Sequence, residues 1–133
     1  MLAFIRRIAL GFLLIFPFST QADPIQNVIS DQIGALMADD FETAFSYASP
    51  SIKRLFGSPE RFGEMVREGY PMVHRPAEVQ MLEQRDVGPH VIQPVMMRDA
   101  MGRIHFLAYA MIETPDGWQI NGVQILRAPE VGT

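Results

Sequence analysis

The sequence predicts an α+β domain in which N-terminal helices pack on one face of a curved, four-stranded antiparallel sheet. Before Gly69 the apolar residues recur at helical spacing behind capping residues, and after it they alternate between glycine-containing turns. Helices followed by consecutive strands with short connections are typical of an α+β fold whose helices cover one face of the sheet.

The first 22 residues have the layout of a secretory signal peptide. Two arginines precede an apolar run from Ile8 to Phe18, and Thr20 and Ala22 are small residues, third and first before a cut after Ala22. The run is shorter than the roughly 20 residues that a membrane-spanning helix needs. We therefore expect residues 1–22 to be removed and residues 23–133 to form a single exported domain that is not held in a membrane. In a Gram-negative bacterium that domain is periplasmic.

Capping residues mark the helix starts. Aspartate and serine accept hydrogen bonds from backbone N–H groups of the first turn, and proline fits the first helical position because its missing N–H needs no partner there. Glycine is typical of helix ends, and Gly57 and Gly69 close two of the segments. The predicted starts are Asp23-Pro24, Asp39-Asp40, Ser49-Pro50 and Ser58-Pro59.

The second half predicts four strands separated by turns that contain glycine with aspartate or proline. Pro94 lies inside the second strand and has no N–H to donate, so we expect that strand at an edge of the sheet or bulged at this point. The predicted strands span Ala77 to Arg85, Val91 to Arg98, Arg103 to Glu113 and Trp118 to Arg127.

Capped helices before a four-strand meander that ends in Asp116-Gly117-Trp118-Gln119-Ile120 resemble the cystatin-like and nuclear-transport-factor-2-like cone folds. Shorter motifs, among them Ala48-Ser49-Pro50, Phe56-Gly57 and Tyr70-Pro71, resemble a family of small bacterial proteins catalogued only as a domain of unknown function. The resemblance covers nearly all of residues 23–128 and implies no catalytic residue, because none is assigned in that family. Cone folds imply a pocket between sheet and helices and, in many cases, pairing of two copies through the sheet.

Composition excludes several classes of function. The chain has no cysteine, which rules out thiol redox chemistry, iron–sulfur clusters and cysteine-based zinc sites. Its net charge is −4 at pH 7, and an acidic surface argues against nucleic acid and anionic lipid as partners. Phosphate-binding loops, nucleophile elbows and paired histidines at metal-ligand spacing are absent from the sequence.

Methionines near a histidine raise the question of a metal site, since thioether and imidazole groups bind copper. Met96, Met97, Met101 and His105 lie across one predicted hairpin. Strand alternation sends Met96 and Met97 to opposite faces, however, and methionine is a common gap-filler in cores. We therefore expect no metal and no cofactor.

Aromatic residues with polar groups are suited to line an apolar pocket, because they combine large apolar area with one hydrogen-bonding group. We expect such a pocket to be bordered by Phe45, Tyr70, Tyr109 and Trp118.

His105 and Tyr109 are the candidates for acid–base catalysis, because they are polar residues well inside one strand and on the same face of it. A catalytic role requires both side chains to face the pocket. We expect instead that His105 is exposed, because Ile104 and Phe106 on the opposite face are better suited to the core.

Three hypotheses of function follow. The first is an exported, non-catalytic module that binds a small apolar molecule or a protein partner. The second is a pocket enzyme of isomerase, dehydratase or hydrolase type that uses acid–base catalysis. The third is a structural module that forms homodimers through its sheet.

Overall fold

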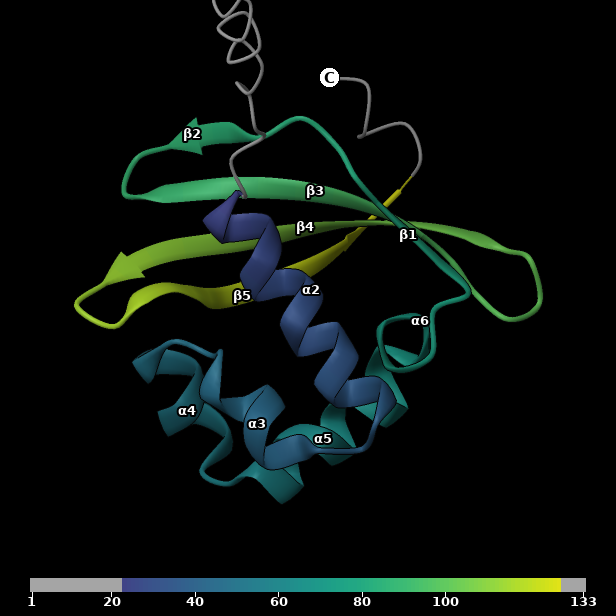
Figure 1. Ribbon diagram of the computed structural model, residues 1–133, viewed down its shortest axis with the longest axis horizontal. Coiled ribbons are helices and arrows are strands. Elements are labelled where there is room, and N and C mark those ends of the chain that lie inside the picture. Colours follow the sequence, from purple (N-terminus) through teal and green to yellow (C-terminus); the bar gives the residue numbers. More distant parts are fainter. Residues whose placement is uncertain (1–22, 128–133) are drawn as a thin grey trace, which may run out of the picture.

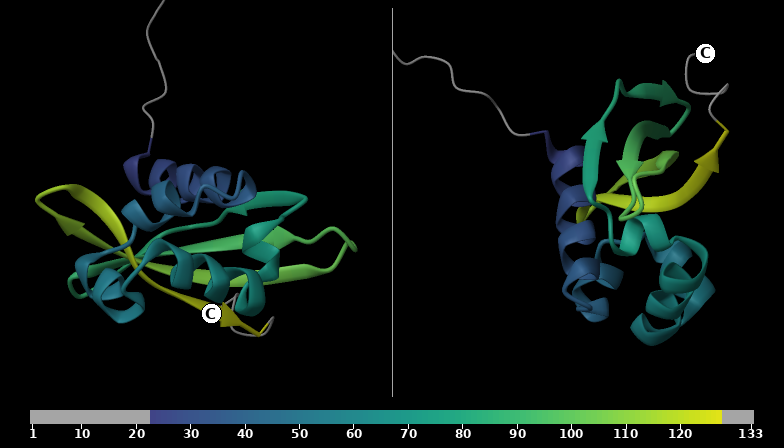
Figure 2. Two further views of the ribbon diagram at one scale, coloured as in Figure 1. Left: turned by 90° about the horizontal axis from the view of Figure 1, so that it is seen from below. Right: turned by 90° about the vertical axis from the view of Figure 1, so that its right-hand side faces the viewer.

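The computed structural model describes residues 23–127 and confirms the predicted α+β fold class. The predicted signal peptide, residues 1–22, lies outside the described residues. The helices come first in the chain and lie beside an antiparallel sheet that is curved but not closed into a barrel (Figure 1, Figure 2). In chain order they are α2 (Pro24–Met37), α3 (Phe41–Ser46), α4 (Pro50–Phe56), α5 (Pro59–Gly69) and α6 (Pro71–His74).

The predicted capping residues begin four of these helices. Asp23, Asp40, Ser49 and Ser58 accept hydrogen bonds from backbone N–H groups in the first turns of α2, α3, α4 and α5. Asp39, which the sequence also suggested as a cap, instead has a left-handed φ of 57° in the turn before α3. Aspartate tolerates this conformation better than most residues. Asp39 therefore belongs to the turn between α2 and α3.

The Asp39 carboxylate fastens this turn to α6. Nε2 of His74 lies 2.8 Å from its Oδ1, and a guanidinium nitrogen of Arg75 lies 3.2 Å from its Oδ2. The hydrogen bond with His74 is the main cause that lowers the pKa of Asp39. Helix α6 itself was not predicted, because four residues are too few to show a helical period.

Five strands form the sheet, one more than predicted. β3 pairs with β1 and β2 on one side and with β4 on the other, and β5 follows β4. The segment predicted as one strand from Ala77 to Arg85 is divided between β1 and β2. The strands are β1 (Glu78–Met81), β2 (Arg85–Val87), β3 (His90–Arg98), β4 (Ile104–Thr114) and β5 (Gly117–Leu126).

The sequence suggested that the strand with Pro94 lies at an edge or is bulged there, but β3 is an interior strand and its register with β4 continues unshifted through Pro94. The carbonyl of Pro94 accepts a hydrogen bond from the backbone N–H of Leu82 at 2.9 Å, so its polar groups point toward the β1 and β2 side. Leu82 belongs to the short interruption between those strands. The missing N–H of Pro94 therefore falls opposite the break, where it costs no hydrogen bond to β4.

The odd-numbered residues of β3 and β4 face the helices. The expectation that Ile104 and Phe106 occupy the core side was wrong, because Ile104 is 44% exposed and Phe106 is half-buried on the opposite face. Both faces of β4 are apolar in sequence, so alternation alone could not tell which one the helices cover. The completely buried residues of the helix face are Gln93, Val95, Met97, Leu107, Tyr109 and Met111.

The free edge of β5 is partly covered by the connection between α3 and α4. Ile120 donates its backbone N–H to the carbonyl of Tyr47, and its carbonyl accepts from the N–H of Ser49, both at 2.9 Å. The ladder between β4 and β5 is irregular at Ala110 and Met111, which leaves Asn121 as an extra residue. This bulge lies beside the helices that follow Ser49 in the chain.

The helices cover the sheet unevenly. α2 and α4 contact β5 directly, whereas α5 packs chiefly on α3 and α6. Close approach of α3 to α5 requires Gly63, because a Cβ there would lie 2.5 Å from Cγ of Phe41. α3 and α5 therefore pack closely together on the side of the molecule away from the sheet (Figure 2).

Candidate functional site

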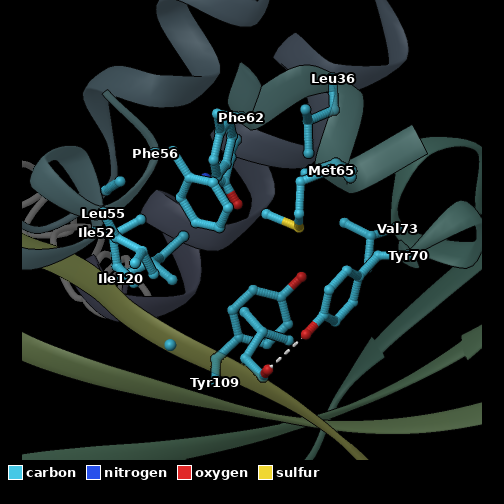
Figure 3. A pocket seen from close by; sticks show the side chains of 15 residues that line it. Leu36, Ile52, Leu55, Phe56, Phe62, Met65, Tyr70, Val73, Tyr109 and Ile120 are labelled. Carbon is cyan, nitrogen blue, oxygen red and sulfur yellow. Dashed lines mark hydrogen bonds between the residues drawn. The ribbon is translucent and has the colours of Figure 1, made fainter. Parts of the chain in front are cut away.

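A cavity of about 230 Å³ lies between the α4–α5 wall and the β4–β5 part of the sheet (Figure 3). Its lining is mainly apolar and includes Ile52 and Phe56 from α4 and Met65 and Val66 from α5. Among the described residues that line it, none carries a formal charge. The cavity is therefore suited to a small, uncharged and mainly apolar molecule.

Tyr109 forms part of the sheet side of this cavity. The residue is 0% exposed, and its hydroxyl has no hydrogen-bond partner among the described residues. Burial raises the pKa of Tyr109, and the neighbouring Tyr70 adds to that rise. The side chain is therefore a neutral O–H group at physiological pH. An unpaired polar group of this kind costs about 1–3 kcal/mol when buried.

The other polar side chains named in the wall, Tyr70 and Gln32, each make a hydrogen bond within the protein. The Tyr70 hydroxyl donates to the backbone carbonyl of Val123 at 3.1 Å, which covers a carbonyl on the free edge of β5 (Figure 3). Nε2 of Gln32, a buried residue of α2, donates to the carbonyl of Ala44 at 3.1 Å. These bonds hold α5, α3 and the sheet edge in place around the space.

Leu55 and Met65 are members of the cavity lining that are not fully buried. Leu55, at the end of α4, is 71% exposed although it lines the cavity, which makes it part of the rim. The Met65 sulfur and the Tyr109 hydroxyl face each other across the space (Figure 3). Because the methionine side chain is unbranched and adaptable, Met65 can change rotamer without disturbing its helix.

Two of the four residues expected to border the pocket line this cavity, and two do not. Tyr70 and Tyr109 are part of its wall, whereas Phe45 and Trp118 lie outside it. The Phe45 ring packs against Phe62 at a centroid distance of 5.4 Å, so Phe62 occupies the position nearer the cavity. Trp118 lies near the β4–β5 turn, in a separate surface groove beside Tyr47 and Lys53. The sequence could not separate these positions, because all four are aromatic residues within amphipathic elements.

His105 does not reach the cavity, although it shares a strand face with Tyr109. Its Nε2 lies 2.9 Å from Oδ2 of Asp99 in the β3–β4 turn. Asp99 Oδ1 also accepts hydrogen bonds from the backbone N–H groups of Met101 and Arg103, each at 2.9 Å. His105, half-buried rather than fully exposed, therefore braces a hairpin turn and cannot act on a molecule beside Tyr109.

Sequence reasoning missed a second polar group on the helix face, the side chain of Gln93. Its Oε1 accepts from Gln84 at 2.8 Å and from Gln26 at 3.3 Å, and its Nε2 donates to the carbonyls of Leu82 and Pro94. The residues of β3 that face the helices run from Val91 to Met97, and an amide side chain in the middle of this otherwise apolar set is the signal that could have indicated its role.

This glutamine network joins the start of α2 to the sheet. Gln84 also donates to Oδ2 of Asp23 at 2.9 Å, while Oδ1 of Asp23 caps α2. Both polar side-chain atoms of Gln93 thus have partners within the protein. We therefore interpret the network as structural.

Other sites have less support. Within residues 23–127 no group of three or more histidine, cysteine, aspartate or glutamate side chains is placed to hold a metal ion. Met96 and Met97 lie on opposite faces of β3, with Met97 completely buried. None of the helices in the same range is long and apolar enough to span a membrane.

The fold and its cavity define a small α+β protein with a hollow, uncharged interior. The chain belongs to the family described as "Domain of unknown function (DUF4864)", whose model matches residues 19–133. No curated protein and no solved structure matches the sequence significantly.

Proposed function

We propose that the protein binds a small apolar molecule in the cavity between α4, α5 and the sheet. The observation that carries the proposal is an uncharged space of about 230 Å³ beside a core that is otherwise closely packed. An engineered apolar cavity of about 150 Å³ holds benzene, so this one suits a molecule of on the order of ten non-hydrogen atoms. Folded proteins rarely keep such space without a reason, because interiors pack to near crystal density.

The enzyme hypothesis has less support than binding. Acid–base catalysis needs an ionisable group within hydrogen-bond reach of the substrate and a pKa near the working pH. His105 lies beside Asp99 rather than the cavity, and burial raises the pKa of Tyr109 away from neutrality. We therefore propose that the protein binds its ligand and performs no chemistry.

Indane, a compact hydrocarbon of suitable size, tests this proposal by methyl NMR. Adding it should shift the methyl signal of Met65, which lines the cavity, and leave that of Met101, which is 79% exposed in a turn, unchanged. Equal shifts at both methionines would indicate nonspecific association, and no shift at Met65 would contradict the proposal.

A matched pair of substitutions adds a second test. Val66→Phe places a ring in the cavity and should abolish the Met65 shift, whereas Val87→Phe adds the same ring on exposed β2 and should leave it intact. Ile52→Phe, which fills the space from α4, repeats the test from another wall in case the first variant folds poorly. Indane binding that survives both cavity substitutions would place the ligand elsewhere.

We also propose that the protein is exported after cleavage behind Ala22. The support is the basic start, the apolar run and the small residues before the cut. Asp23 would then be the first residue, and it already satisfies the N–H groups of Ile25 and Gln26 as the cap of α2. Amino-terminal sequencing of protein from its host should begin at Asp23; a retained Met1 in a membrane fraction would indicate anchoring instead.

Assembly through the sheet remains a separate prediction. The face of β3 and β4 turned away from the helices carries partly exposed apolar residues, including Ile92, Met96, Phe106 and Ile112. Sedimentation at several concentrations tests whether two copies pair there. Phe106→Glu should then reduce the mass of the assembly, and a monomer at every concentration would rule this hypothesis out.

A further inference from the structure

We infer that the ligand is uncharged and carries a hydrogen-bond acceptor, such as a ketone or aldehyde oxygen, that binds the hydroxyl of Tyr109. The inference rests on the proposed function, because it specifies the chemistry of a molecule in the same cavity.

The first observation is the unpaired donor itself. The Tyr109 side chain is completely buried, its hydroxyl has no partner among the described residues, and it points into the cavity (Figure 3). Buried tyrosine hydroxyls are usually hydrogen-bonded, because a group that loses water without gaining a partner destabilises the fold. A ligand acceptor would supply the missing partner.

The second observation is that the neighbouring polar side chains, unlike Tyr109, each have a partner within the protein. The Tyr70 hydroxyl donates to the carbonyl of Val123, and Nε2 of Gln32 donates to the carbonyl of Ala44. Within the described lining, the Tyr109 hydroxyl is the buried side-chain donor that has no partner at all. An unpaired donor on an apolar wall matches a molecule with an acceptor on an apolar body.

The third observation excludes a charged acceptor. The described lining contains no lysine, arginine or histidine that would balance a carboxylate. Moving an unpaired charge out of water is far costlier than moving a neutral carbonyl. Burial also keeps Tyr109 protonated, so the group can only meet the ligand as a neutral hydroxyl.

Met65 provides room for the acceptor. Its sulfur faces the Tyr109 hydroxyl across the space (Figure 3). A thioether is a weak acceptor, and no hydrogen bond joins the two groups among the described residues. A ligand oxygen that moves the flexible Met65 chain aside would thus replace a weak neighbour by a strong one.

Indane and 1-indanone test the inference, because they share a ring skeleton and differ in one carbonyl. The dissociation constants of both are measured with the natural sequence, with Tyr109→Phe, and with the control Tyr47→Phe, whose tyrosine lies outside the cavity. Comparing the ratio of the two dissociation constants between variants cancels the difference in hydration of the ligands and isolates the contribution of the hydroxyl. We expect Tyr109→Phe to shift this ratio against 1-indanone by about tenfold, and Tyr47→Phe to leave it unchanged.

A second measurement does not depend on a variant. The carbonyl stretching frequency of bound 1-indanone should fall relative to that in hydrocarbon solvent, because hydrogen bonding weakens the C=O bond. Indane-1-carboxylate, the charged analogue, should bind at least tenfold more weakly than 1-indanone.

The outcomes separate the two proposals. If both neutral ligands bind and Tyr109→Phe leaves the ratio of their dissociation constants unchanged, the hydroxyl bonds to water and not to the ligand. The acceptor inference then fails, while the proposed binding function stands. Equal or tighter binding of the carboxylate would overturn the requirement for an uncharged ligand. If neither neutral ligand shifts the Met65 methyl signal, the proposed binding function itself fails.

Discussion

Gln93 and Tyr109 are direct neighbours across the β3–β4 ladder, yet their polar groups differ in hydrogen bonding. Both side chains are completely buried on the face that the helices cover. The amide of Gln93 takes part in hydrogen bonds on both its oxygen and its nitrogen, whereas the hydroxyl of Tyr109 has no partner among the described residues. One face of the sheet therefore carries, side by side, a buried polar side chain with hydrogen-bond partners and one without a partner among the described residues.

This difference in hydrogen bonding arises from the elements that cover each residue. The start of α2 and the break between β1 and β2 bring Gln26 and Gln84 directly onto Gln93. Above Tyr109 the wall is α5, which packs on α3 and α6 instead of filling the space over the sheet. The first region is therefore expected to govern stability, and the second to govern binding.

Gln93→Leu should have the largest effect. The substitution keeps the volume similar but leaves the carbonyl of Leu82 and the amides of Gln26 and Gln84 without their partner. We expect a loss of about 3 kcal/mol in the free energy of unfolding, measured by urea denaturation. Gln124→Leu, on the exposed part of β5, is the control and should change it by less than about 0.5 kcal/mol. Similar effects of both would show that the network is not important.

Gly63→Ala should come next, because it acts on the wall above the cavity. Its Cβ would lie 2.5 Å from Cγ of Phe41, so the Phe41 ring or the two helices must shift. We expect a loss of about 2 kcal/mol. Gly34→Ala in α2 has no atom within 4 Å of the new Cβ and should instead raise stability by up to about 1 kcal/mol through helix propensity. Chemical denaturation of the pair checks the sign, and equal effects would contradict the close contact.

Tyr109→Phe should raise the free energy of unfolding of the unliganded protein by about 1 kcal/mol, because it removes a buried donor that has no partner. Tyr70→Phe should lower it by about the same amount, since it removes a bond to the carbonyl of Val123. Thermal or chemical unfolding distinguishes the two tyrosines. A loss of stability from Tyr109→Phe would mean that its hydroxyl is already satisfied.

The smallest effect is on the pH dependence of stability, and it comes from a residue outside both regions. The hydrogen bond with His105, together with the backbone N–H of Arg103, lowers the pKa of Asp99 from 3.8 to about 2. A carboxyl whose pKa is lower in the folded state contributes stability above the unfolded value and loses it as pH falls. Between pH 4 and pH 2 the stability should therefore fall, and Asp99→Asn should make that fall shallower. Parallel acid titrations of the two proteins, followed by circular dichroism, measure the difference; identical curves would contradict it.

Local signals explain why the helices could be predicted from the sequence. Caps such as Asp23 and Ser49 act within one helical turn, so the residues that define each start are adjacent in the chain. The division between β1 and β2 could not be predicted in the same way, because it depends on Gln93 and Pro94 of a different strand. The same holds for the buried face of β4, which is chosen by where the helices pack.

The site was less predictable than the fold. Tyr70 and Tyr109 stood out as aromatic residues with polar groups, but that property is shared by Trp118, which lies elsewhere. What distinguishes Tyr109 is the absence of a partner for its hydroxyl among the described residues, and a missing contact between distant segments leaves no trace in local sequence. Gly63 likewise gives no signal in the local sequence. Its lack of a side chain is required by the close contact with Phe41 on another helix.

Xenon binding in a crystal of the protein tests most directly whether the region above Tyr109 is hollow while that above Gln93 is closed. Xenon under pressure enters dry apolar cavities whatever the natural ligand is. We expect a xenon atom among Ile52, Met65 and Tyr109, and none beside Gln93. A crystal in which Met65 and Phe56 fill the space above Tyr109, with no xenon there, would contradict it.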